Sequence, residues 1–285
     1  MYTEPLFAAS RSAYADAKVV ILGMPLERSV SFRGGCRFAP DAIRTASRNL
    51  EWYSFRYDTD LADALICDMG DLDVNLPITD LKMLVNGAIE DILRDGKLPI
   101  VMGGEHTVSS FIVPATGVDT VIIFDAHPDL RDSYGGDEYA HACTSRRIVE
   151  AVGAENVAII GVRSGSKEEF EYAKDEKILV HSSEDLSSQG PDKIIDDLKS
   201  WVGDDKIYIS IDMDVLDPSF APAVSNPEPY GISPFCIREF IHKFAGQTVG
   251  FDIVEITPTY DHGITAIMGA KFIIEFIHSY LSGDI

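Results

Sequence analysis

The sequence predicts an α/β fold in which helices cover a mostly parallel sheet, because short apolar runs alternate with stretches of helical character. Continuous runs of valine, isoleucine and leucine of this length are typical of strands that are buried on both faces. In addition, acids and histidines follow several of these runs, at the strand ends where ligands bind in such folds. These three observations indicate a ligand-binding α/β domain.

Eight runs have the length and composition of buried strands. They are Val19–Met24, Leu65–Met69, Pro99–Met102, Thr120–Phe124, Val157–Val162, Ile178–His181, Ile207–Ile211 and Val249–Val254. Helices are expected between them, for example at Thr79–Arg94, Arg146–Val152 and Ile237–Phe244. No linker, low-complexity segment or repeat interrupts the chain, so we expect one domain over residues 1–285. The alternation alone fits an open sheet and a TIM barrel equally well.

The composition is that of an ordinary globular protein, with 285 residues and 46% hydrophobic residues. The longest apolar runs, such as Val157–Val162, have the length of strands, so we expect no membrane span. Residues Met1–Ser10 contain Glu4 and lack a basic start followed by an apolar stretch. A signal peptide is therefore not expected, and a cytoplasmic location is predicted.

Charge and cysteine spacing exclude further classes of protein. The chain has 24 basic and 46 acidic residues, and its net charge of −22 disfavours binding to nucleic acid. The same charge would attract a cationic substrate or simply keep the protein soluble, and the sequence leaves both explanations open. Cys36, Cys67, Cys143 and Cys236 are widely spaced without a CxxC pair, so we expect four buried, reduced thiols.

Acids and histidines directly follow four of the predicted strands. They are His106 after the third run, Asp125, His127 and Asp129 after the fourth, Asp212 and Asp214 after the seventh, and Glu255 after the eighth. In an extended chain, residues i, i+2 and i+4 point to the same side. We therefore expect Asp125, His127 and Asp129 to face one point, and Asp212 and Asp214 to do the same.

Four aspartates that converge without a cation would repel one another or have raised pKa values. Two divalent ions would balance their charge, so the motifs predict a binuclear metal site. Mixed imidazole and carboxylate ligands suit Mn²⁺ and also tolerate Zn²⁺, Fe²⁺ or Co²⁺, and the absence of thiolates argues against a structural zinc site. Such a metal pair lowers the pKa of a shared water and directs hydroxide at an electrophilic carbon, which predicts a hydrolase.

Other catalytic motifs are absent from the sequence. No GxGxxG follows a predicted strand, and neither GxxxxGK[ST] nor GxSxG occurs. Dinucleotide binding, phosphate binding by a P-loop and serine hydrolysis at a nucleophile elbow are therefore not supported.

At these motifs the sequence resembles the ureohydrolases, the arginase and agmatinase family, and within it the agmatinases. The matching segments are Gly103–His106, Asp125–Asp129, Ser210–Pro218 and Asp252–Pro258, supported by Phe32–Arg44 and His141–Arg147. The resemblance implies a three-layer, open α/β fold with an eight-stranded, mostly parallel sheet, which decides against the barrel. It also implies two Mn²⁺ ions and hydrolysis of a guanidinium group to urea and an amine.

The resemblance assigns a role to each site residue. It implies that Asp125 and Asp212 bridge both metals, that His106 and Asp129 complete one shell, and that His127 and Asp214 complete the other. Glu255 would pair with the guanidinium, in agreement with the preference of this planar cation for carboxylates. His141 matches the histidine that carries a proton to the leaving amine. Glu105 is expected to point away from the metals, and His181, His242, His262 and His278 are expected to be structural or exposed.

The substrate implied by the resemblance is agmatine, hydrolysed to putrescine and urea by metal-bridged hydroxide. The stretch from Leu130 to Tyr139 is acidic, and Asp132, Asp137 and Glu138 would favour a cationic amine end or form a solvated loop face. Pro222–Pro227 replaces the Pro-Gly-Thr-Gly of many agmatinases, which changes the allowed shapes of that loop.

Several alternatives stay open at this point. Arginine, guanidinobutyrate or aminopropylagmatine could be the substrate, and a metal-binding protein without turnover and a binuclear phosphoesterase are further alternatives. The resemblance also suggests a homo-oligomer, either a trimer or a hexamer.

Overall fold

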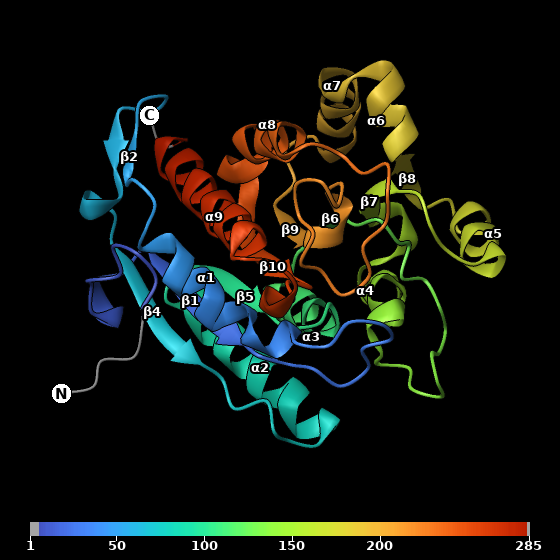
Figure 1. Cartoon of the computed structure of the whole chain (residues 1–285), viewed down its shortest axis with the longest axis horizontal. Helices are drawn as coiled ribbons and strands as arrows, with labels where there is room; N and C mark the ends of the chain where they lie inside the picture. The colour runs from blue at the N-terminus through green and yellow to red at the C-terminus, as the bar shows by residue number, and fades with distance from the viewer. Residues whose placement is uncertain (1–5, 284–285) are drawn as a thin grey trace.

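Eight parallel strands form one open central sheet in the computed structural model, which describes residues 6–283 (Figure 1). The strands are β1 (Val19–Met24), β4 (Ile66–Asp71), β5 (Leu98–Gly103), β6 (Thr120–Phe124), β7 (Val157–Val162), β8 (Leu179–Ser182), β9 (Ile207–Asp212) and β10 (Thr248–Val254). Their order across the sheet is β4-β1-β5-β10-β9-β6-β7-β8. Because β4 and β8 are separate edges, the open sheet is confirmed and the barrel is excluded.

All eight predicted strands are confirmed, with boundaries that differ by at most two residues. Every residue of β1, β5, β6, β7 and β9 is buried, as their continuous apolar composition indicates. The edge strand β8 is only half-buried. A short antiparallel hairpin of β2 (Tyr53–Ser54) and β3 (Thr59–Asp60) was not predicted from the sequence.

Helices cover both faces of the sheet and form the outer two of three layers (Figure 1). They are α1 (Ala39–Ser47), α2 (Ile78–Arg94), α3 (Thr107–Thr116), α4 (Thr144–Val152), α5 (Lys167–Asp175), α6 (Ser183–Gln189), α7 (Pro191–Val202), α8 (Pro234–Phe244) and α9 (Ile264–Ser282). Residues of α1 and α6 to α9 share one apolar core, and residues of α2 to α5 share the other. Alternate strand residues, such as Val20 and Ile21, contribute to opposite cores.

The predicted helices are confirmed and begin slightly earlier than expected. Helix α8 begins at Pro234 rather than Ile237, because the side chain of Ser233 accepts a hydrogen bond from the N–H of Cys236. Proline in the first turn of a helix leaves no intrahelical hydrogen bond unmade, so Pro234 is compatible with this start.

Helix α9 is the one element between residues 6 and 283 whose length and composition would allow it to cross a membrane. This helix was not predicted, because the apolar runs recognised in the sequence have only the length of strands. Its most apolar window is 61% buried inside the protein, and it packs against α1 and α8. These contacts are those of a core helix, so α9 is weak evidence for a membrane segment.

The burial of the cysteines differs from the prediction at one position. Cys36, Cys143 and Cys236 are buried free thiols as expected, but Cys67 in β4 is only partly buried because this strand lies at the edge of the sheet. Of the predicted domain over residues 1–285, residues 1–5, with Glu4, and residues 284–285 lie outside the described part of the chain.

Candidate metal centre

The predicted ligands meet at the carboxyl ends of β5, β10, β9 and β6, which are four adjacent strands in the middle of the sheet. His106 lies between β5 and α3, and Asp125 directly follows β6. Asp212 is the last residue of β9, and Glu255 directly follows β10. Parallel strands end at the same edge, so residues far apart in the sequence converge there, as is usual for ligand sites in open α/β sheets.

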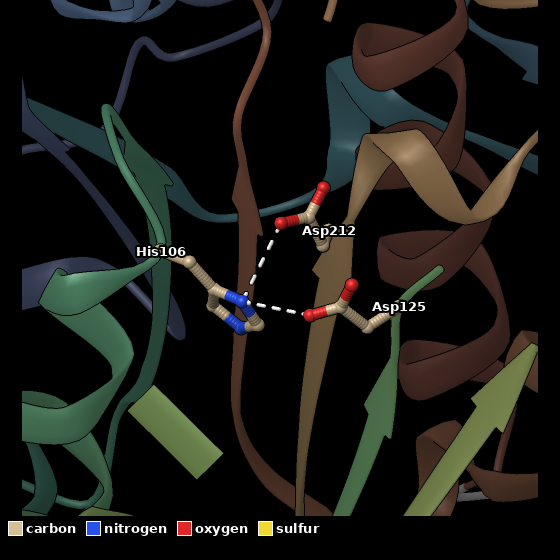
Figure 2. A group of neighbouring side chains, drawn as sticks. All are labelled: His106, Asp125 and Asp212. Atoms are coloured by element: carbon tan, nitrogen blue, oxygen red, sulfur yellow. Dashed lines mark ion pairs between the residues drawn. The ribbon is translucent and has the colours of Figure 1, made fainter. Parts of the chain in front are cut away.

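The first group of ligand atoms surrounds the imidazole of His106 (Figure 2). Its Nδ1 atom lies 3.1 Å from Oδ2 of Asp125 and 3.4 Å from Oδ2 of Asp212. Oδ2 of Asp129 lies 3.2 Å from the same nitrogen. All four residues are buried, so this group could enclose a metal ion away from solvent.

The second group of ligand atoms surrounds His127. Its Nδ1 atom lies 3.0 Å from Oδ2 of Asp214 and 3.6 Å from Oδ1 of Asp125. The side chain of His127 is 23% exposed, whereas that of His106 is fully buried. Asp125 therefore belongs to both groups and offers one carboxylate oxygen to each, which is the arrangement expected of a ligand between two metal ions.

The local backbone differs from the extended chain that the spacing predicted. Strand β6 ends at Phe124, and Oδ1 of Asp125 then accepts the N–H of His127 at 2.6 Å. Asp129 has φ of 51°, in the left-handed region that residues other than glycine rarely adopt. The convergence was predicted correctly, but turns rather than alternation along a strand produce it. Such strained residues concentrate at functional sites.

The second motif also forms a turn. Oδ1 of Asp212 accepts the N–H of Asp214 at 2.9 Å, and a short 3₁₀ turn over Met213–Val215 follows. One oxygen of Asp212 thus organises the turn, and the other faces His106.

The buried carboxylates of the centre need positive charge nearby to remain ionised. Burial and the charge of Asp125 raise the pKa of Asp129 to about 7. Burial, followed by the charge of Asp214, raises the pKa of Asp212 well above its ordinary value. Burial opposes the imidazolium form of His127, but the carboxylates, Asp214 foremost, outweigh it and raise its pKa to about 12. Without metal ions, the centre must therefore hold protons to balance its charge.

One oxygen of the ligand groups is buried without a hydrogen bond. Oδ2 of Asp125 is shielded from solvent and accepts no hydrogen bond within residues 6–283. A buried carboxylate oxygen without a donor is costly unless a cation contacts it. This atom and the mixed imidazole and carboxylate donors fit a pair of divalent transition-metal ions.

Glu255 and His141 lie beside the ligands and line the same cavity, which has a volume of about 180 Å³. Oε1 of Glu255 accepts the N–H of His106 at 2.6 Å, and its backbone is left-handed with φ of 64°. Burial raises the pKa of Glu255 to about 8, and no basic side chain within residues 6–283 forms an ion pair with this carboxylate. Nδ1 of His141 lies 3.0 Å from Oγ of Ser29, and burial lowers the pKa of the imidazole.

Asp132 does not line the cavity. Its side chain is 82% exposed and pairs with Arg147 at 3.1 Å, and Glu138 pairs with the same arginine. Arg131 and Tyr134 are the members of this loop that line the cavity. The acidic character of the loop therefore lies on the outer surface, and the sequence could not reveal which side chains turn inward.

Glu228 lines the cavity and was missed by the sequence analysis. Its carboxylate is 35% exposed and lies 3.9 Å from Nε2 of His127, beyond hydrogen-bond length. No side chain or N–H between residues 6 and 283 donates a hydrogen bond to it. Glu228 directly follows Pro222–Pro227, the loop that differs from the sequence of many agmatinases. That difference was the one feature of the sequence that pointed to this region.

The remaining expectations agree with the structure. Glu105 is buried outside the ligand groups, where it accepts the N–H groups of Arg28 and Ser29. His242 contacts Glu275 at 3.0 Å, and His278 contacts Thr59. Neither histidine reaches the metal centre.

The comparison with known proteins agrees with this geometry. The family model described as "Arginase family" matches residues 17–278. The chain belongs to the arginase family. It is 36% identical over 290 residues to the agmatinase of Bacillus subtilis (strain 168), with 98% of each chain covered. It is also 34% identical to the N(1)-aminopropylagmatine ureohydrolase of Thermococcus kodakarensis, over 90% of this chain and 88% of the relative.

A solved structure matches nearly the whole fold. The agmatine ureohydrolase of Thermoplasma volcanium superposes with a TM-score of 0.94 and 38% identity, covering 99% of this chain and 96% of that one. The chain is therefore an agmatinase-like ureohydrolase with a small guanidino substrate. The family depends on a binuclear metal centre, and the two ligand groups that share Asp125 are the candidates for it.

Proposed function

We propose that this enzyme hydrolyses agmatine to putrescine and urea with two Mn²⁺ ions. The observation that carries the proposal is the pair of ligand groups joined by Asp125, beside the buried carboxylate of Glu255. The proposed ligands are His106 and Asp129 for one ion, His127 and Asp214 for the other, and Asp125 and Asp212 between them. When bound, such an ion pair supplies hydroxide near neutral pH.

Glu255 is proposed to bind the guanidinium group. Its carboxylate lines the cavity at the edge of the metal centre, and no ion pair within the described part of the chain engages it. A guanidinium ion can satisfy a carboxylate through two parallel N–H···O bonds and would orient its carbon toward the ligand groups. The hydrogen bond from the N–H of His106 holds Glu255 in place for this contact.

His141 is proposed to deliver the proton that the leaving amine requires. Water adds its oxygen to the guanidinium carbon, the bond from this carbon to the alkylated nitrogen breaks, and the products are urea and the amine. The amine nitrogen must gain a proton as the bond breaks. Ser29 holds Nδ1 of His141 at 3.0 Å, while the ring lines the cavity and is buried, which favours its neutral form. The neutral ring would first accept a proton from the attacking water and then pass it to the amine nitrogen.

Glu228 supports a substrate with a cationic distal end. Its carboxylate faces the cavity without a hydrogen bond from the described part of the chain, so an ammonium group would be attracted to it. The cation of Arg131 is already paired with Glu169, with Nε 3.3 Å from Oε2. A substrate carboxylate, as in arginine or guanidinobutyrate, would therefore face the negative charge of Glu228.

Aminopropylagmatine is the second candidate, because a relative that shares 34% of its residues is named for that activity. It also carries a cationic distal end, so Glu228 favours both compounds. From the family resemblance we further propose a cytoplasmic homo-oligomer, either a trimer or a hexamer.

The test is an assay of urea release by protein that has been stripped of metal and reloaded with Mn²⁺. Agmatine, aminopropylagmatine, arginine and guanidinobutyrate are offered at equal concentration. We expect the highest kcat/KM with agmatine. Faster hydrolysis of arginine or guanidinobutyrate would refute the role of Glu228, and no urea from any of the four would refute the proposed function.

A further inference from the structure

Asp252 is a buried carboxylate that the proposed chemistry does not use. It lies in β10 with no exposed surface, three residues before Glu255, and it does not line the cavity. A buried charge costs several kcal/mol unless neighbouring groups compensate it, and an apolar side chain would pack at this position without that cost. The carboxylate therefore requires a structural or functional reason.

Three hydroxyl groups donate hydrogen bonds to this carboxylate. Tyr208 donates to Oδ2 at 2.6 Å, Ser109 donates to the same oxygen at 2.8 Å, and Ser210 donates to Oδ1 at 2.7 Å. Ser210 lies opposite Asp252 in the pairing of β9 with β10, so the parallel register sets this contact. The three donors stabilise the ionised form, in opposition to burial, which raises the pKa of Asp252.

The hydroxyl group of Ser210 also contacts His106. Its Oγ lies 3.1 Å from Nε2 of that imidazole. The other ring nitrogen, Nδ1, is the one that faces Asp125 and Asp212 (Figure 2). A serine hydroxyl has one hydrogen, and here it is given to Asp252. Oγ must then accept a hydrogen bond from His106, which requires the hydrogen of the neutral ring to be on Nε2. The lone pair is consequently on Nδ1, the atom that faces the carboxylates of the first ligand group.

We propose that Asp252, acting through Ser210, is a positioning residue that fixes His106 in the tautomer able to bind a metal ion through Nδ1. The chain of hydrogen bonds runs from the imidazole to the serine and from the serine to the carboxylate. Metal-binding histidines usually need such a partner on their second nitrogen, and loss of that partner weakens metal affinity. The inference rests on the proposed binuclear centre but not on the identity of the guanidino substrate.

The proposal predicts an effect at one of the two ions. Asp252 and Ser210 contact neither His127 nor Asp214, so the second ligand group should keep its affinity. In an Asp252→Asn variant, the amide can donate a hydrogen bond to Ser210. The serine hydroxyl would then donate to Nε2 of His106, which would place the ring hydrogen on Nδ1 and oppose metal binding there.

The experiment measures Mn²⁺ binding to stripped protein by equilibrium dialysis, with spin coupling between the two ions followed by electron paramagnetic resonance. The wild type should bind two ions per chain. In Asp252→Asn, the affinity for one ion should fall by about 10- to 100-fold, with loss of spin coupling at limiting Mn²⁺. Ser210→Ala should show the same selective loss of affinity. Because this variant keeps the buried charge of Asp252, its loss of affinity cannot come from removal of that charge.

Tyr208→Phe is the matched control, because it removes a donor to the same carboxylate without touching the link to His106. It should bind both ions with unchanged affinity. Wild-type affinity for both ions in Asp252→Asn and Ser210→Ala would overturn the inference, and so would an equal loss in Tyr208→Phe. If the wild type itself binds fewer than two ions, the proposed function fails together with the inference, whereas a normal wild type with normal variants overturns the inference alone.

Discussion

The floor and the rim of the cavity are built in different ways. The floor comprises the two ligand groups: Asp212 lines the cavity, and His106 and Asp125 lie fully buried behind it, all at the ends of central strands. The rim comprises Arg131 and Glu228, which come from loops and are 38% and 35% exposed. In the proposed function, the floor would hold the metal ions and the rim would meet the distal end of the substrate. Changes to the floor should therefore remove turnover, and changes to the rim should alter substrate preference.

The largest effect is expected from Asp125→Asn. This variant removes the charge that both ligand groups share, so it should bind at most one Mn²⁺ per chain and lose about 1,000-fold in kcat. Metal content after dialysis and urea release are the measurements. Two tightly bound ions in this variant would contradict the assignment of Asp125 as the shared ligand.

Glu255→Gln tests the carboxylate that lines the cavity beside the ligand groups and belongs to neither the floor nor the rim. The variant should retain both ions, because Glu255 belongs to neither ligand group. Its kcat/KM for agmatine should fall about 100-fold, since a buried carboxylate that pairs with a cation contributes about 2–5 kcal/mol. Full activity with normal metal content would contradict the guanidinium contact.

Glu228→Gln tests the rim alone. A partly exposed ion pair contributes about 1 kcal/mol, so KM for agmatine should rise about fivefold with little change in kcat. Asp132→Asn is the matched control, because Asp132 is acidic but points to solvent, and it should leave both parameters unchanged. An equal rise of KM in the two variants would show that overall negative charge, rather than the rim position, attracts the substrate.

Metal removal should lower the thermal stability of the protein. Ligand at 100 times its Kd stabilises a protein by about 2.7 kcal/mol, so chelation should lower Tm by several degrees. The carboxyl group of Asp129, with its pKa raised to about 7, must lose its proton before it binds a metal. The gain in Tm on adding Mn²⁺ should therefore shrink as the pH falls below 7. A gain that increases at lower pH would contradict this assignment.

Much of the fold and of the floor could be predicted from the sequence. Apolar runs that are buried on both faces have a composition that few other structures share, so all eight strands were recognised. Ligands that directly follow such strands must meet at one edge of the sheet. The left-handed turn at Asp129 was not predicted, because the motif spacing is also compatible with an extended chain.

The rim could not be predicted, because loop conformation decides which polar side chains turn inward. Asp132 and Arg131 are neighbours in the sequence, yet Asp132 pairs with Arg147 on the surface and Arg131 lines the cavity. Helix α9 was overlooked for a related reason, because its apolar residues are interrupted by Lys271 and Glu275, and only its packing shows that it belongs to the core.

The most direct test of the metal centre is an anomalous difference map from crystals of the Mn²⁺-loaded protein. We expect two peaks, one between His106 and Asp212 and the other between His127 and Asp214, with one oxygen of Asp125 bonded to each. A single peak, or two peaks that do not share Asp125, would contradict the proposed binuclear centre.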